Sequence, residues 1–337
     1  MGLKKQGVYK RHMILLVKII LASFLIAALL RNGNLDFRSI TEVYNRVDLF
    51  LPALLCLFAG IIISGVRWWI LLAIAGNKIH LRTVLSLQLI GSFFSAWLPG
   101  AAGGDVVRGF HIFRLLENGR STALISIITD RAFALFGLIS IAVCAGLFLP
   151  IELINNTILS SYVGIIKIIC LILVVSFVAV LVFLGLARRF SLLEYVPTKI
   201  RAYLDVIVGT ILIYKRDWLA LVLCWLISML ASGIVVIGIV LIAAVFTYAP
   251  DPLVSAIAGV FGNVFSAIPL TPGGLGVGES IFSKVCTDLS GRAAPFATIY
   301  FAFRVGMLIV NLPGMVVSLF YNHVKHQNMA RSYEGLK

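Results

Sequence analysis

Two arginines inside apolar stretches are the residues of this chain that most clearly indicate chemistry. Arg131 and Arg304 each lie roughly ten residues inside an apolar segment, and 173 residues separate them. An arginine within a membrane costs about 2.5–3.5 kcal/mol on insertion scales, so its side chain should face a partner or a water-filled cavity. The planar guanidinium group suits a phosphate or a carboxylate. We therefore expect both arginines to bind an anionic group, with purely structural ion pairs as the alternative.

Each arginine follows one copy of a repeated pattern. Residues 91–105 and 262–279 both read Gly-x-x-Phe-Ser-Ala, then a proline, a glycine-rich break and a carboxylate, which is Asp105 or Glu279. A helix that starts inside the bilayer has unpaired N–H groups and a positive dipole end, where a carboxylate or another anion can bind. The alternative is that glycine and proline only permit tight packing. Two copies in register, each followed by an arginine, favour the binding role.

The predicted binding site combines the two arginines with nearby carboxylates, hydroxyls and glycines. Its residues are Arg131, Arg304, Asp105, Glu279, Asp130, Ser95, Ser266, Gly103, Gly104, Gly273, Gly274 and Gly276. In the ion-pair alternative, Arg131 pairs with Asp105 or Asp130, and Arg304 pairs with Glu279. We predict no catalytic residue, because neither serine has a nearby histidine or lysine base. No metal-ligand or nucleotide-binding spacing is found, so we predict no metal and no cofactor.

The elements that must position these residues are membrane helices. The chain is 61% hydrophobic and 12% charged, whereas soluble domains carry about 25% charged residues. Apolar runs of about 18 residues or more indicate transmembrane helices. The expected spans are 13–30, 49–75, 121–149, 162–187, 218–248 and 295–321. Near the end of the second span, Arg67, Trp68 and Trp69 suit an anchor at the membrane interface.

Two other apolar segments, 83–98 and 253–267, are short and run directly into the glycine- and proline-rich breaks. This pattern predicts re-entrant hairpins at about 83–120 and 253–292. The basic, partly apolar segment at about 188–216 predicts a helix lying on the membrane surface. With both termini cytoplasmic, the cytoplasmic segments hold 18 Lys and Arg and the opposite side holds 5, as the positive-inside rule requires.

The predicted fold is an all-α integral membrane protein with two inverted-topology repeats, 1–150 and 151–337. Each repeat has three transmembrane helices and one Gly/Pro-broken re-entrant hairpin. Because three is odd, the second repeat enters the membrane upside down relative to the first. This architecture is typical of transporters, whose substrate sites lie near mid-membrane at the repeat interface.

Five short motifs resemble the flippase-like transmembrane domain of lysylphosphatidylglycerol synthases, and the resemblance covers nearly the whole chain. They are the Phe-Ser-Ala…Pro-Gly…Gly-Asp105 segment, Thr129-Asp130-Arg131, Pro272-Gly-Gly-Leu-Gly-Val-Gly-Glu279, Phe303-Arg304 and Asn311-Leu-Pro313-Gly. In the full synthases a soluble aminoacyl-transfer domain follows. This chain ends at Lys337, without room for one, so we expect a stand-alone member that does not aminoacylate lipids.

The resemblance implies translocation of an anionic phospholipid or lipid-linked headgroup across a bacterial cytoplasmic (inner) membrane. We expect flipping by alternating access in a multi-pass protein that is not an enzyme. The alternatives are a membrane-embedded transferase or an accessory subunit acting on a lipid phosphate. Expected partners are a membrane lipid or lipid-linked headgroup and the anionic membrane surface, with a homo-oligomer or a lipid-modifying enzyme left open. The formal net charge of +14 concerns membrane orientation and the anionic lipid surface, so we expect no nucleic-acid partner.

Overall fold

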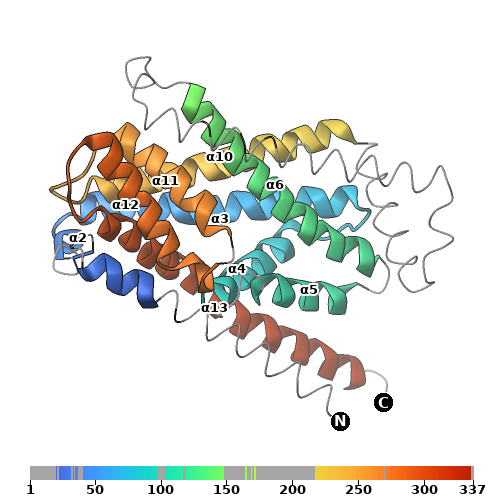
Figure 1. The fold of residues 1–337 in the computed structure, drawn as a ribbon. Helices are drawn as coiled ribbons and strands as arrows, with labels where there is room; N and C mark the ends of the chain where they lie inside the picture. The colour runs from blue at the N-terminus through green and yellow to red at the C-terminus, as the bar shows by residue number, and fades with distance from the viewer. Residues whose placement is uncertain are drawn as a thin grey trace, which may run out of the picture. The chain divides into compact units, whose positions relative to one another are not determined.

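The computed structural model describes residues 20, 23–31, 33, 35–36, 41–97, 103–116, 119–147, 164, 168, 171, 217–268 and 270–334. Throughout these residues the regular elements are helices, and no strand occurs among them (Figure 1). The predicted all-α class is therefore confirmed. The predicted surface helix at 188–216 and nearly all of the predicted span 162–187 lie outside the described residues.

Four helices are long and apolar enough to cross a membrane. They are α3 (Val47–Ile74), α6 (Arg120–Leu147), α10 (Trp218–Ala243) and α13 (Phe296–Glu334). In α6 and α13 the apolar stretch is Arg120–Cys144 and Phe296–Tyr321. All four agree with predicted spans, so the chain is a multi-pass membrane protein. Part of the first predicted span is also helical, at residues 23–31, and the short α2 (Thr41–Asn45) follows it.

Four shorter helices form two helical hairpins. The first hairpin consists of α4 (Leu81–Trp97) and α5 (Gly103–Leu115), and the second of α11 (Pro252–Ser266) and α12 (Val277–Ser290). At 1.5 Å per residue, a helix of 15 residues is about 22 Å long, less than the roughly 30 Å of a bilayer core. Helix α11 begins sharply, because the Asp251 carboxylate accepts a hydrogen bond from the Leu253 amide at 2.8 Å and Pro252 occupies the first turn.

The chain forms two compact units. Unit 1 contains Met1–Ile62, Ser86–Arg108 and Gly233–Lys337, and unit 2 contains Ile63–Leu85 and Gly109–Ser232. Both units draw on the two halves of the sequence. The compact units therefore do not coincide with the predicted repeats 1–150 and 151–337, and the repeats stay a prediction.

Glycines allow the helices of unit 1 to approach closely. A Cβ atom at Gly306 would lie 3.2 Å from the side chain of Leu54 and 3.3 Å from that of Leu57, which places α13 against α3. A Cβ atom at Gly314 would overlap the backbone carbonyl of Leu89, which places α13 directly against α4. Small residues at such crossings are characteristic of helix packing in membranes. Helix α13 thus contacts both the long helix α3 and the first hairpin.

Unit 2 is built around α6, the C-terminal part of α3 and the N-terminal part of α10. Leu71, Ala75 and Cys224 are buried together in its core. A Cβ atom at Gly137 would overlap the backbone and side chain of Ser228, so α6 and α10 cross closely. This packing positions a polar group of unit 2 described below.

Candidate functional site

The connection of the second hairpin is a turn that only glycine accommodates easily. A single 3₁₀ turn, η3 (Pro272–Gly274), links α11 to the start of α12. Gly273, Gly274 and Gly276 have φ angles of 62°, 70° and 80°. Residues with a side chain rarely adopt this left-handed backbone conformation, whereas glycine adopts it at little cost. The three glycines predicted as site residues are therefore needed by the backbone of this turn.

Glu279 caps the N-terminus of α12. Its Oε2 atom accepts a hydrogen bond from the Gly276 amide at 2.8 Å, and the residue is 1% exposed. A carboxylate in the first turn satisfies an otherwise unpaired N–H group and complements the positive end of the helix dipole. The capping role predicted for this carboxylate is thus present in the structure.

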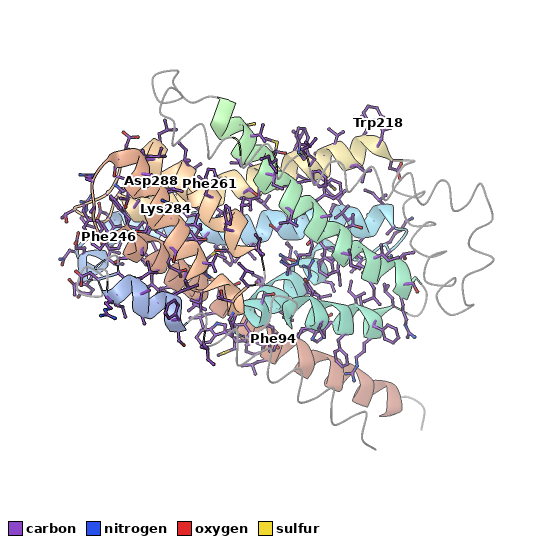
Figure 2. All side chains as sticks on the ribbon, viewed as in Figure 1. Phe94, Trp218, Phe246, Phe261, Lys284 and Asp288 are labelled. Atoms are coloured by element: carbon purple, nitrogen blue, oxygen red, sulfur yellow. The ribbon has the colours of Figure 1, made fainter. Side chains whose placement is uncertain are left out.

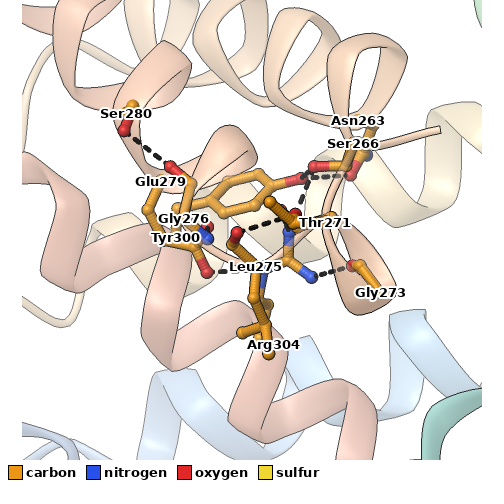
Figure 3. Close-up of polar contacts among 11 residues, drawn as sticks. Asn263, Ser266, Thr271, Gly273, Leu275, Gly276, Glu279, Ser280, Tyr300 and Arg304 are labelled. Carbon is orange, nitrogen blue, oxygen red and sulfur yellow. Dashed lines mark hydrogen bonds and ion pairs between the residues drawn. The ribbon is translucent and has the colours of Figure 1, made fainter. Parts of the chain in front are cut away.

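Arg304 ties the parts of this turn together (Figure 3). Its Nε atom lies 2.5 Å from Oε1 of Glu279. Its Nη1 donates to the Gly273 carbonyl at 2.6 Å, and its Nη2 donates to the Gly274 carbonyl at 2.6 Å and to Ser266 Oγ at 3.1 Å. The arginine side chain remains 18% exposed. The ion pair weighed in the sequence analysis exists, and the guanidinium group also holds the carbonyls of the turn.

Tyr300 completes the second hairpin and was not selected from the sequence. Its hydroxyl donates to Asn263 Oδ1 at 2.9 Å and lies 3.2 Å from Ser266 Oγ. Its ring covers Gly262 and Gly278, where an added Cβ atom would overlap it. The available signal was its spacing, because a residue four positions before Arg304 shares the same helix face.

The first hairpin shows a matching contact between a serine and a glycine. A Cβ atom at Gly104 would overlap Ser95 Oγ and the Gly91 carbonyl, and one at Gly278 would overlap Ser266 Oγ. In both hairpins, therefore, the second arm begins with a glycine pressed against the serine of the first arm. Gly103 and Asp105 also lie in the first turn of α5.

The carboxylate of the first hairpin is also paired. Asp105 Oδ1 lies 3.4 Å from Nη1 of Arg108, one turn further along α5. Arg108 was not selected from the sequence, although its spacing of three residues from Asp105 is the signal that could have found it.

The last two predicted site residues, Asp130 and Arg131, belong to unit 2. Asp130 is buried, and its Oδ1 accepts from Arg67 Nε at 2.8 Å. Arg67 Nη1 also donates to Ser228 Oγ at 3.0 Å, so the group joins α3, α6 and α10. The side chain of Arg131 is exposed.

The interpretation of Arg67, Trp68 and Trp69 as an interface anchor is wrong for the first two residues. Arg67 is 3% exposed and Trp68 is fully buried. The physical reason is that both find polar partners on α6: Arg67 pairs with Asp130, and Trp68 Nε1 donates to Ser126 Oγ at 3.1 Å. Buried polar groups are retained where such partners exist.

The structure thus gathers the predicted site residues into separate groups. Unit 1 holds both hairpin tips, with Arg304, Glu279 and Asp105 among their residues, whereas Arg131 and Asp130 lie in unit 2. A single site shared by Arg131 and Arg304 stays a prediction.

The family model described as the lysylphosphatidylglycerol synthase TM region matches residues 15–314 of this chain. The chain belongs to this family. The match includes both hairpins and every predicted site residue, and it connects the protein with membrane lipids. No curated protein and no solved structure matches the chain.

One face of the second hairpin of this family member carries charge. Lys284 and Asp288, labelled on α12 in Figure 2, form an ion pair at 3.1 Å, and the lysine side chain is 67% exposed. Exposed charge is costly against hydrocarbon, so this face of α12 suits water or lipid headgroups. Among the described residues, no group of three or more His, Cys, Asp or Glu is placed to hold a metal ion.

Proposed function

We propose that this protein translocates an anionic phospholipid or lipid-linked headgroup between the leaflets of the bacterial cytoplasmic membrane by alternating access. The observation that carries the proposal is the tip of the second hairpin. There a partly exposed Arg304 and a buried Glu279 meet beside a short broken helix, within a chain of the lysylphosphatidylglycerol synthase family. A guanidinium group with an exposed edge can exchange a carboxylate for the phosphate of a headgroup.

The matched construction of the two hairpins supports alternating access. Both have a serine at the end of the first arm, a glycine pressed on it and a carboxylate next in sequence. We therefore propose inverted repeats at 1–150 and 151–337, with hairpins entering from opposite leaflets and both termini cytoplasmic. In transporters of this architecture the site lies at the repeat interface.

The experiment is a flipping assay in proteoliposomes containing phosphatidylglycerol with a fluorescent acyl chain, read by quenching with membrane-impermeant dithionite. We expect Arg304→Ala and Arg131→Ala each to slow flipping at least about tenfold, which corresponds to about 1.4 kcal/mol. Arg304→Lys should give an intermediate rate, because lysine keeps the charge but not the planar fork. The matched control is Arg114→Gln, which removes an exposed arginine of α5.

Melting temperatures of the same preparations identify variants that fail to fold. Flipping at the normal rate by folded Arg304→Ala and Arg131→Ala would reject the proposal. Mass spectrometry of the lipids after incubation tests the alternative: a covalently altered lipid would indicate a transferase. Stable co-purification with a soluble enzyme would instead indicate an accessory subunit.

A further inference from the structure

Glu279 is the buried carboxylate of the second hairpin, and Arg304 is the group that compensates its charge. The glutamate side chain is 2% exposed, whereas the arginine side chain is 18% exposed. Oε2 of Glu279 accepts a hydrogen bond from the Gly276 amide. Oε1 accepts no hydrogen bond within the described part of the chain and lies 2.5 Å from Nε of Arg304. The charge on this oxygen is therefore balanced by the guanidinium group.

The remaining titratable groups near Glu279 do not replace the arginine. Tyr300 of α13 interacts electrostatically with Glu279, but a phenol is neutral below about pH 10. Helix α11 contributes an amide and a hydroxyl to this tip, and neither ionises (Figure 3). Further along α12, Lys284 and Asp288 pair with each other at an exposed face. The charge balance of Glu279 thus depends on what Arg304 binds.

Binding of a phosphate at Arg304 changes this balance. Under the proposed function, the phosphate of a headgroup takes the place of the Glu279 carboxylate on the guanidinium group. The positive charge then compensates the phosphate, and an almost fully buried carboxylate is left uncompensated. Such a carboxylate is costly in a site of low dielectric constant, so it takes up a proton instead. The result is a neutral guanidinium–phosphate pair beside a neutral carboxylic acid.

We infer that Glu279 is a proton-binding site, which takes up a proton when a headgroup phosphate binds Arg304 and releases it when the phosphate leaves. The inference rests on the proposed function and deepens it by naming a second ligand of the same site. The proton comes from water at the exposed edge of Arg304 and forms an O–H bond at Oε1, because Oε2 keeps the hydrogen bond from the Gly276 amide. The new O–H group can donate to the phosphate. Lipid and proton therefore bind together.

The first test is proton uptake by the purified full chain in detergent. The weakly buffered protein at about pH 7 is titrated with phosphatidylglycerol, whose phosphodiester stays ionised, and a pH-indicator dye reports the uptake. We expect about one proton to be taken up for each lipid bound. Diacylglycerol with the same acyl chains lacks the phosphate and should cause no uptake.

The second test is the pH dependence of the affinity for phosphatidylglycerol, measured as the rise in melting temperature with lipid concentration. Because a proton is taken up on binding, the affinity should rise as pH falls, at least about fivefold from about pH 8 to about pH 6. Glu279→Gln is uncharged and keeps an oxygen for the Gly276 amide, so its affinity should be high at both pH values. A merely structural role of Glu279 would lower the melting temperature but would leave the pH dependence in place.

Asp251→Asn is the matched control. It removes another carboxylate of the second hairpin, and asparagine is as good an N-cap for α11 as aspartate. This variant should keep the pH dependence of the parent protein. The inference is overturned if the parent takes up no proton, if folded Glu279→Gln keeps the pH dependence, or if Asp251→Asn loses it. The uptake measurement needs no variant, so it decides the question even if Glu279→Gln does not fold.

Failure of the inference can be told apart from failure of the proposed function. Flipping of phosphatidylglycerol in vesicles, without proton uptake on binding, would contradict the role of Glu279 and leave translocation standing. Binding with proton uptake, but without movement of the lipid across vesicles, would contradict translocation alone.

Discussion

Two arginines of the described residues, Arg67 and Arg304, each form an ion pair with a carboxylate on another helix. Arg67 pairs with Asp130 of α6 at 2.8 Å. Arg304 pairs with Glu279 of α12 at 2.5 Å. Removal of one partner from a buried pair is costly because the remaining charge is left uncompensated. These pairs therefore hold particular helices together.

The pair in unit 2 gives a stability prediction. Asp130→Ala should lower the free energy of unfolding by about 3–5 kcal/mol, because Arg67 keeps its charge without its carboxylate. The double variant Arg67→Met/Asp130→Ala should be less affected than Asp130→Ala alone. The measurement is denaturation in detergent micelles followed by circular dichroism.

The control for this prediction is Ser140→Ala. The Ser140 hydroxyl accepts from Trp225 Nε1 at 2.9 Å at an exposed edge of the same unit, and its loss should cost no more than about 1 kcal/mol. If Asp130→Ala unfolds no more easily than this control, the buried pair is not what fastens α3 to α6.

Sequence reasoning found one of the buried pairs and missed the other. Glu279 and Arg304 were linked by their place in a repeated pattern. Arg67 and Asp130 are 63 residues apart and in no repeat. Their pairing depends on how α3 and α6 rotate about their own axes, which is set by packing such as the burial of Trp68. The spacing of residues in the sequence does not specify how the two helices are rotated.

At the scale of elements, the hairpins depend on backbone approach that a single methyl group prevents. Gly104→Ala should lower the free energy of unfolding by about 3 kcal/mol or more, because its Cβ would meet the backbone carbonyl of Gly91, which cannot move aside cheaply. The measurement is the same denaturation experiment in detergent.

Gly109→Ala is the matched control on the same helix. Its Cβ would lie 3.1 Å from the end of the flexible Leu124 side chain, and alanine is favoured over glycine within a helix. We expect a change within about 1 kcal/mol. Equal stability of the Gly104→Ala and Gly109→Ala proteins would show that α4 and α5 do not need to cross so closely.

Helix existence was predictable from composition, whereas helix ends were less so. The predicted span 218–248 ends earlier, at Ala243, because residues 244–248 form successive turns before Pro250. Hydrophobicity continues through those turns and hides the end of the helix. The glycines of the second hairpin connection were recognised as a break, but their use in binding the Arg304 side chain through two carbonyls was not.

At the scale of the whole molecule, the charge distribution predicts which side of the membrane each hairpin faces. In a variant with the five native cysteines replaced by alanine, Lys78→Cys and Ala293→Cys each place one thiol at an exposed position beside a hairpin. We expect a membrane-impermeant maleimide to label Lys78→Cys only from the cytoplasmic side and Ala293→Cys only from the opposite side. Right-side-out and inside-out vesicles supply the two measurements. Labelling of both positions from one side would refute the inverted arrangement.

The four spanning helices of the described residues and the family followed from the sequence, because hydrophobicity and motif spacing are properties of single segments. Which segments join in each compact unit did not follow from the sequence. Unit 1 combines residues from the beginning, the middle and the end of the chain. The apolar surface of a membrane helix does not indicate which helix packs against it, because lipid tails are as apolar as a leucine side chain.

Helix α13 carries a further consequence of its contacts. Arg304 holds the tip of the second hairpin and Gly314 lies against α4 of the first, ten residues or about 15 Å further along the same rod. A tilt of α13 as a rigid helix would therefore move both contact points together. Pro313 lies beside the second contact and removes one backbone hydrogen bond there. Helix α13 is therefore most easily bent where it contacts α4. A bend there would allow the contact with the first hairpin to move independently of the contact with the second.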